Sequence, residues 1–193
     1  MRGHLYVGYE LFKAGHLEAA KTHMKHPENE LYADVAPAFE ARGTGGFAAE
    51  LEALASAVEM GKPKPEVAKA YAGLMTAIEK NEAPALDTQR SSKARLKLAA
   101  ALVRVAGEEY GIAVVNGEMK SAHEYQDALG FTTVARSIVS SLDDVSAKKE
   151  AAKLLDEALD AMWPDLVPPK TLKTAADQLY GTAARLDLLA ASL

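Results

Sequence analysis

Apolar residues recur every three to four positions along most of this chain, the spacing that gathers them on one face of a helix. Hydrophobic residues make up 49% of the 193 residues, and most of them are alanine and leucine. These two residues have high helix propensity, whereas strands prefer the β-branched and aromatic side chains that are scarce here. The sequence therefore predicts an all-α fold, a helical bundle of about seven to nine helices.

Glycine, proline and capping residues set the expected ends of these helices. Gly15 ends the first helix, Pro27 ends the second, and Gly61 caps the helix that precedes it. Ser121, with Glu124 three residues later, predicts a capping box at a helix start. The expected helices cover residues 4–14, 17–25, 27–42, 47–60, 66–80, 93–110, 121–142 and 146–162, and a last helix that Pro168 and Pro169 open.

Residues 81–92 are polar and contain a proline, which is the composition of a linker. They separate an N-terminal helical half, residues 1–80, from a C-terminal helical half, residues 93–193. The two halves can also pack as one compact domain. Residues 112–117 carry a hairpin signal in the pair Asn-Gly, but no alternating strand pattern follows it, so we expect a helix end and a loop there.

The first two expected helices resemble the hairpin of a tetratricopeptide repeat. Gly8 and the stretch 11–20 put small residues and a turn glycine roughly where that motif has them. The pattern does not recur at the ~34-residue period of such repeats, and a solenoid needs several copies. The N-terminal part is therefore expected to hold a single TPR-like hairpin and not a peptide-binding array.

Charge and composition exclude several classes of function. The formal net charge of −5 argues against a nucleic-acid partner, which would require a basic surface. No apolar stretch approaches the ~20 residues that a membrane-spanning helix needs. The first residues have no apolar signal core, so the protein is either cytoplasmic or a mature chain whose export signal has been removed.

The chain contains no cysteine, which excludes disulfides, thiolate metal sites and cysteine nucleophiles. Any metal site must therefore use histidine, carboxylate, methionine or backbone oxygen ligands. The sequence also lacks the nucleophile elbow, the phosphate-binding glycine loop and the His-Glu-X-X-His motif. We therefore expect a protein that is not an enzyme; a histidine–carboxylate metal enzyme is the weaker alternative, with no substrate indicated.

Four of the five histidines lie within the first 26 residues. His23 and His26 are one helical turn apart, and Glu30 follows four residues later, beyond the break expected at Pro27. A turn of the chain at that proline would let the three side chains converge. Imidazole and carboxylate ligands without thiolates suit iron, copper, zinc or nickel. The sequence therefore offers a candidate transition-metal site at this corner.

The other three histidines are supporting candidates for metal ligands. His4 could join from the preceding antiparallel helix, and His16 lies two helical turns before the corner. His123 belongs to a second group, in which Asp127 lies one turn away and Glu124 is adjacent. All of these histidines can equally be ordinary helix-surface residues, and acidic residues at a helix start are also explained by the helix dipole.

Residues 110–128, YGIAVVNGEMKSAHEYQDA, combine a tyrosine near a helix end, an Asn-Gly turn and a Glu-Tyr pair at the start of the next helix. This stretch resembles the periplasmic helical domain fused to some bacterial high-affinity iron permeases. The segments 2–5 and 23–32 resemble uncharacterised helical proteins of exported type. The Arg-Glu-Gly-Leu-Glu signature of the permease itself is absent, and so is the Gly-X-His-X-X-Glu motif of imelysin-like periplasmic proteins.

The resemblance implies a periplasmic soluble domain that binds a transition-metal ion and acts in metal uptake, delivery or sensing. Iron is the first expectation for the ion, with copper and zinc as alternatives. The implied partners are the metal ion and a membrane permease or another periplasmic protein, and transport itself is not implied. A helical protein–protein interaction module without metal is the alternative, in which alanine-rich grooves dock a partner helix.

Overall fold

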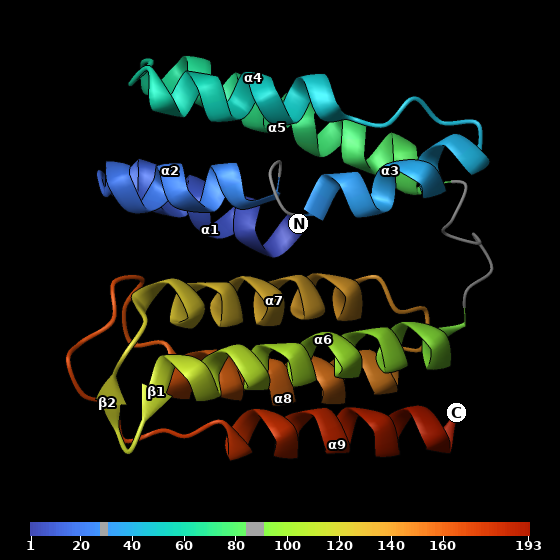
Figure 1. Ribbon diagram of the computed structural model, residues 1–193. Coiled ribbons are helices and arrows are strands. Elements are labelled where there is room, and N and C mark those ends of the chain that lie inside the picture. The colour runs from blue at the N-terminus through green and yellow to red at the C-terminus, as the bar shows by residue number, and fades with distance from the viewer. Residues whose placement is uncertain (28–30, 84–90) are drawn as a thin grey trace. The chain divides into compact units, whose positions relative to one another are not determined.

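The computed structural model describes residues 1–27, 31–83 and 91–193 (Figure 1). These residues divide into two compact units, unit 1 before residue 84 and unit 2 after residue 90. Nine α-helices and one short pair of strands account for the regular structure of the described residues, so the predicted all-α helical bundle is confirmed. No helix in the described part of the chain is both long enough and apolar enough to cross a membrane.

Unit 1 contains five helices, the first two of which form the expected hairpin. Gly15 makes the turn of this hairpin with a positive φ of 90°, and its N–H donates to the carbonyl of Phe12 at 3.1 Å. The N–H of His16 donates to the carbonyl of Leu11 at 2.9 Å. The helices are α1 (Arg2–Ala14), α2 (Leu17–His26), α3 (Tyr32–Ala41), α4 (Ala48–Glu59) and α5 (Lys64–Glu82).

The loop between α3 and α4 is held by a buried amide and an aromatic cluster. The side chain of Asn81, on α5, accepts from the N–H of Gly46 at 2.7 Å and donates to its carbonyl at 3.0 Å. Phe47 packs against the rings of Tyr32 and Phe39, with centroid distances of 5.2 and 5.1 Å. These contacts hold the ends of α3, α4 and α5 together.

Of the helix expected over 27–42, the structure describes α3 from Tyr32 to Ala41. Pro27 itself keeps helical angles, φ −59° and ψ −35°, because its ring fixes φ near the helical value. Residues 28–30, and with them the predicted ligand Glu30, lie outside the described residues.

Unit 2 is a four-helix bundle. The helix α6 packs against both α7 and α9, and α8 packs against the same two helices, so each has two neighbours (Figure 1). Its core is rich in alanine, which allows the helices to approach closely, and leucine, valine and aromatic side chains fill the layers between them. The elements are α6 (Ser92–Ala113), β1 (Val114–Val115), β2 (Glu118–Met119), α7 (Ala122–Ser140), α8 (Val145–Met162) and α9 (Asp177–Ser192).

The prediction of a loop after α6 is wrong, because the chain forms a β-hairpin there. Val114 pairs with Met119 in an antiparallel register, and Asn116 and Gly117 form the turn with φ of 53° and 77°. Positive φ at both positions is the requirement of a type I′ turn, so the local Asn-Gly signal was the correct one. A distant segment also pairs with this hairpin: Thr171, about 50 positions later in the chain, forms an antiparallel bridge with Glu118.

The same pairing explains why the last helix does not begin at Pro168 and Pro169, as expected, but at Asp177. The carbonyl of Lys170 accepts from the N–H of Met119 at 3.0 Å. The N–H of Leu172 donates to the carbonyl of Gly117, in the hairpin turn, at 2.9 Å. Backbone groups used in this ladder are not available for helical hydrogen bonds. The segment after the two prolines is therefore extended.

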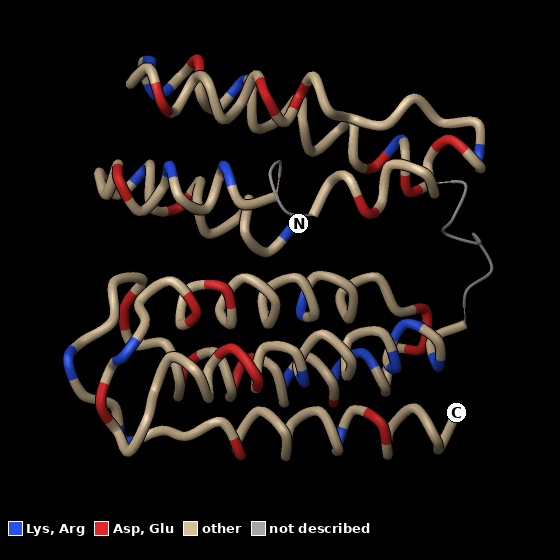
Figure 2. The backbone as a smooth tube through the Cα atoms, viewed as in Figure 1, with Lys and Arg blue, Asp and Glu red and all other residues tan. Residues whose placement is uncertain are grey.

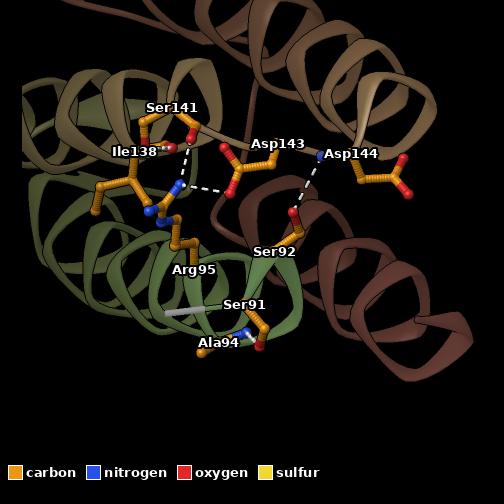
Figure 3. A network of polar contacts seen from close by, with 8 residues as sticks. All are labelled: Ser91, Ser92, Ala94, Arg95, Ile138, Ser141, Asp143 and Asp144. Carbon is orange, nitrogen blue, oxygen red and sulfur yellow. Dashed lines mark hydrogen bonds and ion pairs between the residues drawn. The ribbon is translucent and has the colours of Figure 1, made fainter. Parts of the chain in front are cut away.

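The first turns of α6 are basic, as Figure 2 shows, although the positive end of the helix dipole lies there. The end of α7 compensates for this charge. Arg95 donates to the carbonyl of Ser141 and forms an ion pair with Asp143 at 3.5 Å (Figure 3). The N–H of Asp144 donates to Ser92 Oγ at 3.2 Å, so the start of α6 is tied to the α7–α8 loop.

The helices on either side of the α7–α8 loop, α7 and α8, each have a side-chain cap at their N-terminal end. Ser121 Oγ accepts from the N–H of Glu124 at 3.3 Å, which confirms the predicted cap of α7. At the start of α8, Asp144 Oδ1 accepts from the N–H of Ala147 at 2.8 Å. Both contacts satisfy N–H groups that have no partner within the helix.

Replacement of Asp144 by alanine is expected to lower the free energy of unfolding by about 0.5–2 kcal/mol, because the cap of α8 is lost. The neighbouring change Asp143→Ala removes only the exposed ion pair with Arg95 and should cost about 0–1 kcal/mol. Guanidinium denaturation followed by circular dichroism measures both. Equal destabilisation by the two variants would contradict the assigned capping role.

Candidate metal centres

Three of the predicted histidines converge in unit 1. His4 lies on α1 and His23 on α2, and their side chains are buried, with 5% and 0% exposure. One ligand nitrogen of His4 lies within 4.8 Å of one of His23. The ring of His26, which is partly exposed, lies 4.7 Å from the ring of His4 between centroids. We call these three residues the histidine cluster.

A glycine allows α1 and α2 to approach closely at this cluster. Gly8 lies one helical turn after His4, on the same face of α1. A Cβ atom at this position would lie 3.1 Å from the Cβ of His23 and 3.2 Å from the Cε of Met24. A side chain at this position would force its neighbours on α2 to shift by a few tenths of an ångström, so glycine favours the close crossing that brings the histidine of α2 against α1.

The other predicted ligands lie elsewhere. His16 is exposed and is the N-cap residue of α2. At ~1.5 Å of rise per residue it is about 10 Å along the helix axis from His23, too far for both to bind one ion. Glu30 is outside the described residues, and His123 belongs to unit 2.

The histidine cluster has the ligand chemistry of a transition-metal site. Imidazole nitrogens bind iron, copper, zinc and nickel, and metal–nitrogen distances in such sites are about 2.0–2.1 Å. Two ligands of one ion are therefore about 3–4 Å apart, and the nitrogens of His4 and His23 lie within 4.8 Å of each other. Two of the three rings are buried, which excludes competing water from that side.

A second group of ligand side chains lies at the start of α7. One ligand atom each from His123, Glu124 and Asp127 lies within 4.8 Å of the others. His123 Nε2 is 3.3 Å from Asp127 Oδ2, and the side chain of this aspartate is only 4% exposed. The sequence predicted this group from its spacing, with His123 as a supporting ligand candidate, Asp127 one helical turn away and Glu124 adjacent.

The residues between these ligands fix the start of α7 to the loop after α8. Tyr125 Oη donates to the carbonyl of Asp165 at 2.9 Å, and Gln126 Nε2 donates to that of Leu166 at 3.1 Å. In return, Trp163 Nε1 donates to the carbonyl of Tyr125 at 3.0 Å. Burial raises the pKa of the Tyr125 phenol, so it stays protonated and remains a donor at neutral pH.

Residues 85–191 match the family model of the iron permease-associated 4-helix bundle domain. This match spans α6, the hairpin, α7, α8 and nearly all of α9, and it includes the second ligand group. No curated protein and no solved structure matches the chain. As the resemblance of residues 110–128 predicted, the chain belongs to the iron permease-associated 4-helix bundle domain family.

Proposed function

We propose that the protein binds a transition-metal ion, iron first, in the periplasm and passes it to or receives it from a membrane permease. Two independent observations support this function. The family is one associated with iron permeases, and the histidine cluster offers imidazole ligands that suit iron, copper or zinc. The convergence of His4, His23 and His26 from two helices is the observation that carries the proposal.

The cluster is better suited to an exchangeable ion than to a permanent structural one. Structural zinc sites are closed by four protein ligands, most often including thiolates, and this chain has no cysteine. Three imidazoles leave coordination positions open for water or for a ligand of a delivery partner. His26 is partly exposed, and it gives the ion a path to solvent. Open positions and a solvent path are the properties that capture and delivery require.

Calorimetric titration of the metal-stripped protein with Fe(II) under anaerobic conditions, and with Cu(II) and Zn(II), tests the proposal. His23→Ala and His26→Ala should each weaken the affinity of the unit 1 site by about 10- to 100-fold or more. His16→Ala is the matched control, because it removes an exposed histidine of the same hairpin and should leave the affinity unchanged. Absence of uptake, or uptake that neither variant alters, would sink the proposed metal role.

The periplasmic location has its own test. Osmotic-shock fractionation of cells that express the natural gene should release the protein with periplasmic markers. Recovery with cytoplasmic markers alone would contradict a role outside the inner membrane, whatever the metal titrations show.

A helical interaction module is the second candidate function, and the outer face of α6 favours it. Leu98, Val105 and Ile112 are exposed hydrophobic residues at intervals of seven, so they form one stripe along this helix. In a pull-down from periplasmic extract, Val105→Lys should abolish capture of a partner that binds this stripe. Val145→Lys, at an exposed position on α8, is the control. Failure to recover any stable partner counts against this candidate.

A further inference from the structure

The helix α6 carries a row of exposed apolar side chains on the face that looks away from the bundle. Leu98, Val105 and Ile112 are 38%, 38% and 58% exposed, and their spacing of seven residues places them along one line about 21 Å long. The neighbours of α6 in the bundle, α7 and α9, pack against its other sides. We call these three residues the α6 stripe. It leaves a continuous apolar line on the surface of unit 2.

Two charged residues lie beside the α6 stripe. Lys97 and Glu108 are both exposed, and they are 11 residues apart, about three helical turns, so they share the face of the stripe. In the part of the chain that the structure describes, neither side chain forms an ion pair. The basic residues of α6 lie between positions 93 and 104, and its acidic residues are 108 and 109 (Figure 2). The face therefore offers one sign of charge near each end.

This charge pattern is complementary to itself when a second copy of α6 runs in the opposite direction. In a parallel pair, Lys97 would face Lys97 and Glu108 would face Glu108, and like charges side by side are unfavourable. In an antiparallel pair with its two-fold axis near residue 103, each Lys97 lies level with the glutamates at 108 and 109 of the other copy. The two helix dipoles are then also antiparallel, so opposite partial charges are adjacent at both ends.

The apolar side chains fit the same register. Val105 of one copy faces Ala101 of the other. Ile112 faces Ala94 in the same way, and Leu98 falls between Val105 and Ile112 of the other copy. Large side chains opposite alanines let two helices approach to about 8 Å with interdigitated side chains. Charge and side-chain size therefore select the same antiparallel pairing.

We propose that α6 forms the interface of a two-fold symmetric dimer, in which a second copy of this chain covers the α6 stripe with its own α6. Each contact then forms twice, because a two-fold interface uses the same surface on both copies. The stripe is narrow and its side chains are only partly exposed, so the dimer should be a weak, transient one. The proposal rests on the interaction-module function, whose partner it names, and it is independent of metal binding.

Sedimentation velocity of the full chain over a concentration series tests the dimer. We expect the mass to rise from the 20.5 kDa of one chain towards twice that value. Val105→Lys should weaken association by about 10-fold or more, because it places two lysines near the centre of the interface. Val145→Lys adds the same charge at an exposed position of α8 and should leave association unchanged. A chain that stays monomeric at every concentration would overturn the proposal.

Charge reversal tests the antiparallel register. Lys97→Glu and Glu108→Lys should each weaken the dimer by about 3- to 30-fold, because symmetry removes two ion pairs at once. The double variant exchanges the two charges and should restore association. A zero-length carbodiimide cross-link between Lys97 and Glu108 must join two copies, since within one chain they are about 16 Å apart along the helix. A double variant no tighter than either single one, with no such cross-link, would overturn this pairing.

The results distinguish this dimer from the functions proposed above. Suppose that the chain is monomeric, but Val105→Lys still abolishes capture of a partner from extract. The α6 stripe then belongs to that partner, so the dimer proposal fails and the interaction module stands. A monomer that also captures no partner contradicts both. Metal titration of Val105→Lys should match that of the unmodified chain, because the histidine cluster lies in unit 1.

Discussion

Replacement of Trp163 by alanine is expected to lower the free energy of unfolding of the four-helix bundle by about 3–5 kcal/mol. The indole is 8% exposed; it packs edge-on against the ring of Tyr110, 5.6 Å between centroids, and at a tilt against that of Tyr125, 6.3 Å between centroids. It is also the donor of the hydrogen bond to the carbonyl of Tyr125. Alanine would leave a cavity at the end of the bundle and would remove the contact between α7 and the end of α8.

Trp163→Phe is the matched control, since it keeps most of the ring and loses the indole N–H. We expect it to cost much less, about 1–3 kcal/mol, chiefly from the lost donor and the smaller ring. Denaturant unfolding followed by circular dichroism measures both variants, because neither retains the fluorescence of the single tryptophan. A loss below 1 kcal/mol for Trp163→Ala would show that this aromatic cluster is not part of the cooperative core.

Replacement of Gly8 by leucine is the second change with a large expected effect. A side chain at this position meets the Cβ of His23 at 3.1 Å, and both atoms are close to the backbone, so neither can move without displacing a helix. Overpacking of this kind costs about 1–3 kcal/mol, more than helix propensity returns. Because α1 and α2 must separate, the variant should also weaken metal binding by the histidine cluster.

Gly73→Leu is the control for this change. Gly73 lies within α5 and is exposed, and apart from its two chain neighbours and the backbone of its own helix, no atom of the described residues lies within 4 Å of a Cβ placed there. Leucine at this position should raise the free energy of unfolding by roughly 0.5–1 kcal/mol through helix propensity alone. Thermal unfolding together with Zn(II) titration separates the two variants. Equal stability of both, with equal affinity for the ion, would contradict the close helix crossing at Gly8.

The family match and the histidine cluster lie on different parts of the chain. The match covers unit 2, whereas His4, His23 and His26 lie in unit 1.

Local signals in the sequence were sufficient for most of the helices and for the caps at Gly15, Gly61 and Ser121. Gly15, Gly61 and Ser121 each act within a few residues of their own position, so their effect can be read from the sequence alone. The resemblance of residues 110–128 also needed no structure, and the family match confirms it. The spacing of His23 and His26 by one turn follows directly from helical periodicity.

Long-range pairing decided what the sequence could not. The hairpin after α6 is joined by Thr171, and this pairing keeps the segment after Pro168 and Pro169 out of the last helix. No local pattern records a partner about 50 residues away. The same holds for the histidine cluster, where His4 reaches His26 only because two helices cross closely at Gly8. The sequence by itself determined the helices, the ends that are set by local caps and the family, since those depend on neighbouring residues; only the tertiary structure decided where the last helix begins and which ligands meet, because those depend on how separate segments pack.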